Sequence, residues 1–395
     1  MKPWTQIPLG ELCEVTAGGT PSRAVASNFG GDIPWVKIGD MVQGRVVTTE
    51  ERLSRSGLET SAAKILPAGT VLMSIFATIG RTAVLCVDAA TNQAIVGITP
   101  RNADVLRPEY LRRFLDSQAS SLERRARGVA QVNINSSLLK AVPVPLPPLP
   151  EQRRIAEILD KADALRAKRR AALAQLDTLT QSIFLDMFGD PATNPRGWRE
   201  SMLLGDVADI VSGVTIGRKL DGKSTRTVPY LAVVNVQDRH IDLSVTKTTE
   251  ATEDEIQRYR LERSDLLLTE GGDPDKLGRG SLWNDELAEC IHQNHVFRVR
   301  LRSKELTPLF LNWLVGSQRG KKYFLRSAKQ TTGIASINMT QLRSFPLLVP
   351  PLSRQRDFAK QVSAVDALKT THLAGIAEVD ALFASLQHRA FRGEL

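Results

Sequence analysis

The sequence predicts an α+β fold in which two mixed α/β domains alternate with two long helices. Three observations predict it: an internal repeat, a proline cluster at the same place in both copies of the repeat, and a long apolar stripe after each cluster. With 395 residues, the chain is long enough for two domains of about 150 residues each and the segments that connect them.

The internal repeat has a period near 200 residues and emerges when the sequence is slid over itself. The offset between matching positions drifts along the chain, which we attribute to insertions in loops. The matches are residues 9–12 with 204–207 at an offset of 195, 108–111 with 308–311 at 200, Gly128 and Asn133 with Gly333 and Asn338 at 205, and 147–149 with 350–352 at 203. The chain therefore consists of two copies of one sequence repeat.

The first part of each copy is typical of a mixed α/β domain. Short runs rich in apolar and β-branched residues, such as 69–74 and 265–269, are separated by Gly and Asn turns. Helical patches are brief, and one of them covers residues 109–116. Each first part therefore predicts a globule of strands and short helices.

The second part of each copy predicts one long helix. Proline clusters at 142–150 and 345–352 end the preceding globules. After them, apolar residues recur at steps of three and four, from 155 to 183 and from 358 to 386. The two stripes should bury each other, and a duplicated unit closes around a pseudo-two-fold axis when its two helices are antiparallel. The expected segments are 1–146, 147–190, 191–349 and 350–395.

The composition indicates a polyanionic partner. Lys and Arg number 52 against 43 Asp and Glu, which gives a net charge of +9 and a pI of 9.6. The most apolar stretch, 65–79, is short and interrupted by Pro67 and Gly69, so we expect no contact with a membrane. Three isolated cysteines, Cys13, Cys86 and Cys290, favour a reducing compartment. We therefore expect a cytoplasmic protein.

One segment imitates a phosphate-binding loop. Residues 217–224 match the pattern GxxxxGK[ST], which would make the chain a nucleotidase. A phosphate loop must open a helix, but the residues that follow Ser224 are β-branched and end at Pro229. We therefore expect a variable loop. If the chain were an enzyme, nucleotide hydrolysis would be the alternative function.

A metal site and a catalytic site are both expected to be absent. Cys290, His292 and His295 have a tolerable spacing for a metal, but no fourth ligand is within reach along the sequence. The sequence has no Gly-rich methyl-donor loop, no methylase signature and no acid pair followed by Lys in nuclease spacing. We expect no catalytic residue in this chain, and chemistry supplied by partner chains.

Five motifs occur in a fixed order on the duplicated frame. They are GGTPS at 18–22, GGDIPW at 30–35, PPLPEQRRI at 147–155, FGDP at 188–191 and LQHRAFRGEL at 386–395. Their order resembles that of the specificity subunits of type I restriction-modification enzymes, and the resemblance covers the whole chain. The second copy departs from the pattern, because it has Tyr230 in place of Trp35 and no counterpart of GGTPS.

The resemblance implies a function. Segments 1–146 and 191–349 would be target recognition domains that each grip one half of a split double-stranded DNA target. Segments 147–190 and 350–395 would set the gap and dock two methyltransferase subunits, which restriction-translocase subunits then join. The resemblance implies no cofactor in this chain, with S-adenosylmethionine, ATP and Mg on the partner subunits. Two alternatives stay open: a related system whose methylase and nuclease are fused, and an adaptor whose globules bind proteins.

The residue types that read base edges are Arg, Lys, Asn, Gln, Ser and Thr. In the first copy the candidate DNA-binding residues are Thr20, Ser22, Arg23, Lys37, Arg81, Gln93, Gln131 and Asn133. In the second copy they are Arg218, Lys219, Lys223, Asn235, Arg239, Lys276, Arg279, Gln293, Lys329 and Asn338.

Each of these candidates has a competing interpretation. Any single Lys or Arg is otherwise a solvated surface residue, and Asn133 and Asn338, which recur in the repeat, are otherwise caps of a helix or turn. The basic run at 166–170 is either a solvated helix face or a contact to DNA phosphates.

Overall fold

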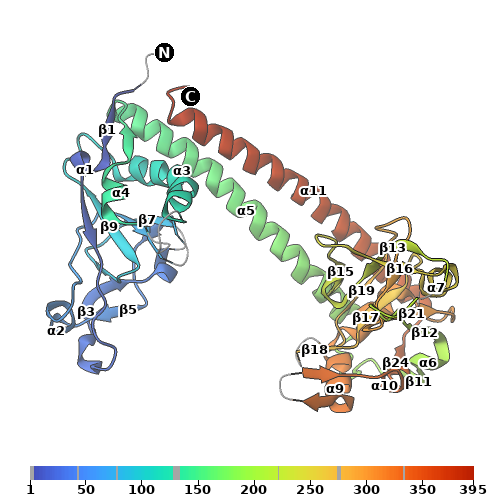
Figure 1. Ribbon diagram of the computed structural model, residues 1–395. Coiled ribbons are helices and arrows are strands. Elements are labelled where there is room, and N and C mark those ends of the chain that lie inside the picture. Colours follow the sequence, from blue (N-terminus) through green and yellow to red (C-terminus); the bar gives the residue numbers. More distant parts are fainter. Residues whose placement is uncertain are drawn as a thin grey trace. The chain divides into compact units, whose positions relative to one another are not determined.

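The structure is a computed structural model that describes residues 4–41, 44–76, 79–127, 134–220, 222–273, 277–331 and 334–395. It divides into two compact units. The first unit is Met1–Ala171 with His372–Leu395, and the second unit is Ala172–Thr371. Each unit holds its own sheets and short helices together with a part of both long helices (Figure 1).

The first unit is built on two sheets. A five-stranded sheet has the order β2 (Cys13–Ala17), β9 (Ile95–Pro100), β6 (Val71–Ser74), β7 (Thr82–Leu85) and β4 (Arg45–Val46). A three-stranded sheet has the order β5 (Glu51–Leu53), β3 (Phe29–Val36) and β8 (Ala90–Thr91), and β1 (Gln6–Pro8) pairs with β10 (Pro143–Pro145). The helices are α1 (Leu9–Leu12), α2 (Arg55–Glu59), α3 (Pro108–Arg127) and α4 (Ser136–Lys140), with 3-10 turns at Ala26–Asn28 and Ile38–Met41.

The second unit repeats this plan. Its sheets have the orders β12 (Ala208–Ser212), β21 (Val296–Leu301), β17 (Leu266–Thr269), β19 (Gly280–Leu282), and β16 (Lys247–Ala251), β13 (Arg226–Leu231), β20 (Ile291–His292). Smaller sheets join β14 (Val236–Gln237) to β15 (His240–Ile241), β11 (Arg199–Leu203) to β24 (Pro346–Val349), and β18 (Gly271–Gly272) to β23 (Ile334–Ser336) and β22 (Lys329–Thr331). The helices are α6 (Leu204–Val207), α7 (Glu253–Tyr259), α8 (Pro308–Val315), α9 (Gln318–Ser327) and α10 (Met339–Arg343), with a 3-10 turn at Val233–Asn235.

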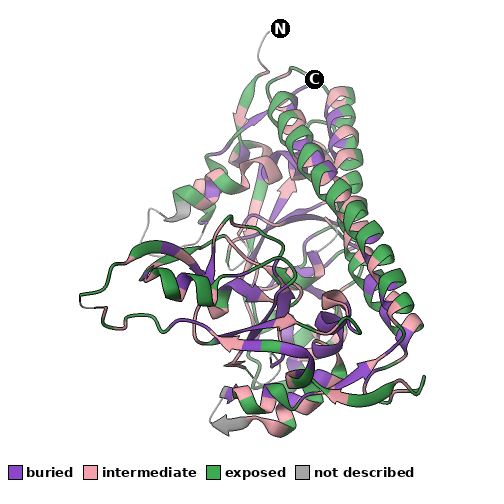
Figure 2. Ribbon diagram, turned by 90° about the vertical axis from the view of Figure 1, so that its right-hand side faces the viewer, coloured by how far each residue is buried: buried purple, intermediate pink, exposed green. Residues whose placement is uncertain are grey.

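The central strands explain why these sequences fold as sheets. In β6 every residue is buried, and in β17 the run Leu266, Leu267 and Leu268 is buried as well. Continuous buried runs of four residues, of which three are apolar, suit strands covered on both faces rather than on one. Figure 2 shows buried strands among exposed loops and helices.

The repeat is confirmed by strand register. β2 pairs antiparallel with β9, with Val15 opposite Ile98, and β12 pairs antiparallel with β21, with Ile210 opposite Val299. The parallel pairs β3 with β8 and β13 with β20 also correspond. Both halves of the chain therefore share these strand pairings, although the main sheet has five strands in the first unit and four in the second.

One predicted match is wrong in register. The structure equates Asn338, whose side chain caps α10, with Asn135, whose side chain caps α4 by accepting a hydrogen bond from the Leu138 amide at 2.7 Å. The offset is therefore 203, the same as along the long helices, and the predicted match of Asn133 with Asn338 at 205 fails. Gly128 and Asn133 themselves lie outside the described residues.

One helix is longer than the sequence pattern indicates. The predicted patch at 109–116 is the first part of α3, which continues to Arg127 because Ala, Leu, Glu and Arg, all good helix formers, follow it. In the second unit the corresponding helical region is split, since α8 ends at the cap Gly316 and α9 begins after Ser317.

The two long helices follow the proline clusters, as predicted. They are α5 (Leu149–Phe188) and α11 (Leu352–Ala390), and α5 ends before Gly189, whose φ of +75° suits a helix terminus. Among the described residues, no helix combines the length and the apolar character that crossing a membrane requires.

The long helices are antiparallel within each unit. In the first unit Arg166 of α5 binds Asp380 of α11 at 2.6 Å, and in the second unit Asp177 binds Lys369 at 2.8 Å. In the first unit Arg169 also lies against Gly375, and in the second unit Met187 also contacts Gln361, so within each unit the position on α11 falls as the position on α5 rises. Adding 203 to Arg166 and subtracting 203 from Asp380 gives Lys369 and Asp177, so the two ion pairs are copies related by the repeat.

Candidate nucleic-acid interface

Two loops meet at the edge of the sheet in each unit. In the first unit the loop after β2 packs so closely on the loop after β8 that a Cβ on Gly18 would lie 2.0 Å from the Asn92 carbonyl oxygen. In the second unit a Cβ on Gly213 would lie 1.9 Å from the His292 carbonyl oxygen. Only glycine permits this approach.

Several predicted residues gather on these loops. Thr20, Ser22 and Gln93 are exposed in the first unit, and Gln293 is half-buried at the corresponding place in the second unit. Gln93 follows Asn92 directly, as Gln293 follows His292. The structure therefore brings three predicted residues of the first unit to one pair of neighbouring loops.

Arg23 and Lys37 are held by one carboxylate. The side chains of both residues bind Glu51 at 2.8 Å, and Lys37 also binds Glu50 at 2.7 Å. The hydrogen bonds from Lys37 and Arg23 lower the pKa of Glu51. The Arg23 guanidinium lies 4.7 Å from the centre of the Phe29 ring. The cluster thus offers both donors and acceptors at fixed positions, which are the two kinds of group that read base edges.

Arg81 lines a cleft of about 690 Å³ in the first unit, between α3 and the long helices. Its guanidinium donates to the carbonyl oxygen of Ile38 at 3.3 Å. Burial raises the pKa of Asp116, which accepts a hydrogen bond from Thr82 in the same cleft. The charged residues of the cleft are Arg45, Arg81, Glu109, Arg112, Arg113, Asp116, Asp160, Asp163 and Arg166.

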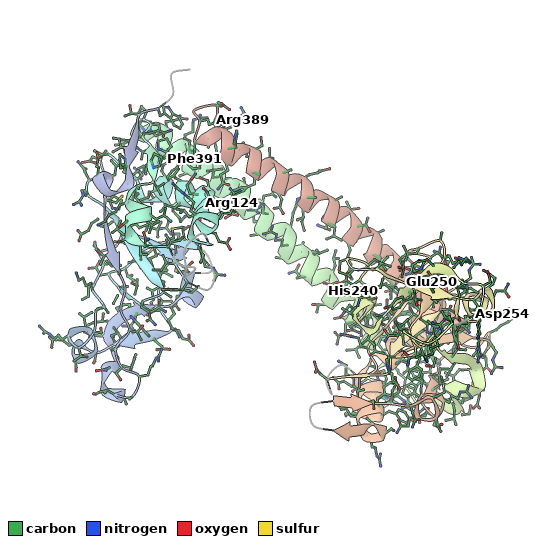
Figure 3. All side chains as sticks on the ribbon, in the orientation of Figure 1. Arg124, His240, Glu250, Asp254, Arg389 and Phe391 are labelled. Carbon is green, nitrogen blue, oxygen red and sulfur yellow. The ribbon has the colours of Figure 1, made fainter. Side chains whose placement is uncertain are left out.

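Arg239, in the hairpin of β14 and β15, lies close to Arg279, which directly precedes β19, in the second unit. The backbone amide of Arg239 donates to Gly280, the neighbour of Arg279, at 2.8 Å, and the Arg279 side chain donates to Gln237 at 3.1 Å. The Arg239 guanidinium stacks 3.8 Å from the centre of the Trp313 ring, and its backbone has a φ of +59°. Figure 3 labels His240 on this hairpin.

The segment that imitates a phosphate loop leads into strand β13 and not into a helix. Within it Arg218 binds Glu255 at 2.8 Å, and this bond lowers the pKa of Glu255 to about 2. Lys219 and Lys223 are exposed. The phosphate-loop interpretation is therefore contradicted, and the segment stays a loop that presents two exposed lysines.

Two predicted asparagines serve the chain itself. Asn235 is buried, donates to the carbonyl oxygens of Asp242 and Val245, and accepts from the Ala232 amide at 2.8 Å. Asn338 accepts from the Gln341 amide at 2.9 Å and caps α10, so the capping interpretation is confirmed for it. Both side chains shape their loops.

Three candidates, Gln131, Asn133 and Lys276, lie outside the described residues, and Lys329 begins strand β22. In the basic run, Arg166 and Arg170 both bind Asp380. Arg169 fits against Gly375, where a Cβ would lie 2.0 Å from its guanidinium. This part of the run is therefore engaged between the two long helices rather than free.

The three residues with metal-like spacing are used otherwise. Cys290 is buried, and His295 binds Glu270 at 2.5 Å. His292 has Nδ1 2.7 Å from the Val296 carbonyl oxygen, and burial lowers its pKa to about 4, so the ring is neutral. Within the described ranges, no group of three or more His, Cys, Asp and Glu side chains is arranged to hold a metal.

Sequence reasoning missed the ionic contact between α3 and the long helices. Arg113 is 5% exposed and binds Asp160 at 2.6 Å and Asp163 at 3.0 Å. Arg112 binds Asp160 as well, at 2.7 Å. The partners lie 47 to 50 residues apart in the sequence, so no local pattern links them.

Comparison with known proteins identifies the family. The chain matches the family described as type I restriction modification DNA specificity domain twice, over residues 1–175 and 195–379. The two matches correspond to the two copies of the repeat and together cover most of the chain. The protein therefore belongs to this family, and the expectation drawn from the motifs is confirmed.

Similar proteins carry the corresponding names. The chain is 22% identical to the type I restriction enzyme StySPI specificity subunit of Salmonella potsdam, and the match covers 99% of this chain and 89% of that protein. It is 24% identical to the EcoKI specificity subunit of Escherichia coli K12, with the same two coverages. A chain solved in a study of complex assembly and conformational transition of the type I R-M system has the same fold, with a TM-score of 0.64 at 20% identity and coverage of 100% of this chain and 99% of that chain.

Proposed function

We propose that this chain recognises a bipartite double-stranded DNA target, with one half-site read by each unit, as the specificity subunit of a type I restriction-modification complex. One observation carries the proposal: the two units share their strand pairings but present different side chains at corresponding places. Trp35 corresponds to Tyr230, and Lys37, which binds Glu51 together with Arg23, corresponds to Ala232. Two recognition domains with a common backbone arrangement and different side chains suit two different half-sites.

The charge of the chain supports DNA as the ligand. A net charge of +9 favours a polyanion, and cations at fixed positions contact phosphates and set the register on the duplex. In the second unit Arg239 and Arg279, with the exposed Lys219 and Lys223, supply such cations. In the first unit the fixed donors and acceptors around Glu51 suit base edges.

Exposed leucines on the long helices support docking of two identical partners, which we assign as methyltransferase subunits. Leu165 and Leu368 are 44% and 51% exposed, and Leu179 and Leu382 are 44% and 53% exposed. Within each pair the residues differ by 203, the offset of the repeat. Leu165 and Leu382 lie beside the Arg166–Asp380 ion pair, so each unit offers one exposed leucine from each helix at one level. Figure 2 shows how much of these helices is exposed.

The chemistry is assigned to the partners. Restriction-translocase subunits join the assembly, and S-adenosylmethionine, ATP and Mg are bound by partner subunits and not by this non-catalytic chain. The paucity of cysteine, with no cysteine pair among three, supports work in the reducing cytoplasm.

DNA recognition is tested by exchanging one of the two recognition domains. Residues 1–146 are replaced by the first domain of a relative with a different target, and methylated sites are mapped by sequencing the DNA of cells that hold the whole system. We expect one half-site to change while the other half-site and the gap stay. If both half-sites change, or if the parent complex methylates no split target, the proposed function is wrong.

Docking is tested separately. In the double variant Leu165→Asp and Leu382→Asp, both changes fall in the first unit, so we expect the purified complex to retain only one methyltransferase subunit by light scattering. The control Val245→Asp changes an exposed apolar residue of the second unit away from the long helices and should retain both. If both subunits remain bound to the double variant, the docking surface is misassigned.

A further inference from the structure

Each long helix buries a glutamine in its first turn. Gln152 is the fourth residue of α5 and Gln355 is the fourth residue of α11, and the side chains of both are fully buried. A buried primary amide is costly unless its donors and acceptor are paired. Both glutamines meet this demand in the same way.

In the first unit the Gln152 amide ties the start of α5 to the loop that precedes α3. Its Oε1 accepts from the Arg107 amide at 2.9 Å, and its Nε2 donates to the carbonyl oxygens of Val105 and Pro147, both at 2.9 Å. The first two partners belong to the globule, and Pro147 belongs to the approach to the helix.

In the second unit the Gln355 amide repeats these bonds. Its Oε1 accepts from the Thr307 amide at 2.8 Å, and its Nε2 donates to the carbonyl oxygens of Glu305 at 2.9 Å and Pro350 at 2.8 Å. All six partners in the two units are main-chain atoms. The globule side can therefore change its side chains, from Val105 to Glu305 and from Arg107 to Thr307, without loss of a bond.

Arg112 and Arg113 also form hydrogen bonds to α5 in the first unit, but Asn312 and Trp313 stand in their places in the second unit, so these contacts are not common to both copies. One aromatic contact is shared: Tyr110 meets Phe391 at 5.6 Å in the first unit, and Phe310 meets Phe188 at 4.8 Å in the second unit. Figure 3 labels Phe391 at the end of α11. Apolar contact has little directionality, whereas three hydrogen bonds from one amide fix both position and orientation.

We propose that Gln152 and Gln355 are positioning residues that each fix one recognition globule at a set angle on its own long helix, and so make the enzyme selective for one gap length. The inference rests on the proposed function, because it requires a target of two half-sites. Neither glutamine touches DNA in this proposal. Each acts through the orientation of the globule whose loop it holds.

The test uses the purified complex of the full chain with its methyltransferase subunits. Gln152→Met keeps the volume of the side chain and removes all three bonds. Binding is measured on duplexes with the native gap, with a gap one base pair longer or shorter, and with a mismatch in either half-site. We expect the preference for the native gap to fall about tenfold, together with discrimination at the half-site of the first unit only.

Gln355→Met should lower the preference for the native gap in the same way, with discrimination lost at the half-site of the second unit only. The control Glu157→Gln changes an exposed residue two turns into α5 and should leave every ratio unchanged. Gln152→Asn retains an amide on a shorter arm and should lie between the parent and Gln152→Met.

The outcomes separate the inference from the proposed function. If the parent complex shows no preference for a gapped target, the proposed function fails. If the parent shows it but folded variants keep the same gap preference, or lose both half-sites equally, the positioning role is wrong. Hydrogen exchange in β6 and β9 reports folding, and if Gln152→Met and Gln152→Asn both unfold the first unit, the glutamine is only a structural residue and the proposal is overturned.

Discussion

At one corresponding position, the globule of the first unit contacts its long helix through ion pairs, and the globule of the second unit contacts the long helices through aromatic rings. Arg113 of α3 binds Asp160 and Asp163 of α5, whereas Trp313, at the same place in the repeat, stacks on Phe184 at 5.4 Å and meets Phe358 edge-on at 5.7 Å. The backbone frame is thus the same while the chemistry of the joint differs.

The partners differ together with the joint. Asp160 corresponds to Ser363 in α11, so the second unit has a counterpart of one of the two α5 carboxylates that bind Arg113, since Asp163 is retained as Asp366. Phe184 corresponds to Gln387, so the first unit lacks the ring on which a tryptophan would stack. Once two copies are fused in one chain, the contact between globule and long helix can change its chemistry in each copy, provided that the residues on both sides change together.

The largest effect is expected at the aromatic joint. Trp313→Ala removes a buried ring from the contacts with Phe184 and Phe358, and should lower the free energy of unfolding of the second unit by about 3–5 kcal/mol. Hydrogen exchange in β17 and β21 measures this loss. The exposed control Val245→Ala should cost less than about 0.5 kcal/mol. A loss under about 1 kcal/mol for Trp313→Ala would show that the rings do not hold the joint.

A smaller loss with a different signature is expected at the ionic joint. Arg113→Met leaves the carboxylates of Asp116, Asp160 and Asp163 without their shared cation, and should cost about 2 kcal/mol, because Asp160 and Asp163 are partly solvated. Chemical denaturation at about 0.1 M and about 1 M salt measures it, since salt screens the repulsion among the carboxylates.

The salt dependence sharpens the comparison. The loss in Arg113→Met should shrink at high salt, while the loss in Trp313→Ala should stay constant. Arg153→Met, which removes an exposed i,i+4 pair with Glu157, is the control and should cost less than about 0.5 kcal/mol. Equal losses for Arg113→Met at both salt concentrations would contradict the ionic description.

The effect of pH isolates one ion pair of the second unit. Arg218 holds the pKa of Glu255 at about 2 in the folded chain, below its ordinary value of 4.5. A depressed pKa stabilises the fold above the ordinary value, and this contribution is lost as the pH falls from about 4.5 through about 2. We expect Glu255→Gln to cost about 1–2 kcal/mol at pH 7 and nearly nothing below the lowered pKa. A loss that does not depend on pH would contradict this assignment.

The smallest difference is expected where the two units are alike. Asn135→Ala and Asn338→Ala each remove the N-cap of a short helix, and each should cost about 1 kcal/mol. Hydrogen exchange in α4 and α10 compares them. A loss in one unit only would show that Asn135 and Asn338, although they correspond at an offset of 203, do not stabilise their helices equally.

The sequence alone predicted the parts of the fold that repeat at a fixed period. The repeat and the two long helices were visible because apolar residues recur over many turns after a proline cluster. The length of α3 was not, because its second half, with Ser117 and Ser121 among charged residues, has helix formers but a weak apolar stripe. The order of strands depends on pairing across the whole domain and leaves no local signal.

The types of residue in the candidate site could be predicted from the sequence, but the partners that these side chains bind within the chain could not. Arg23, Lys37 and Arg218 were chosen as cations, and their binding to Glu51 and Glu255 follows only from contacts made in three dimensions. Asn235 was chosen as a polar loop residue, but its burial depends on a loop that closes over it. Contacts with DNA stay predictions for all of the candidates.

The glutamine joints have a consequence for inheritance. Because Gln152 and Gln355 bind only main-chain atoms of the globule, these two points of attachment do not depend on which side chains a newly acquired globule carries there. A single exchange of coding sequence between related genes, with its ends in the segments that encode the helix starts, therefore yields a lineage with a new target while the genes of the partner subunits remain unchanged.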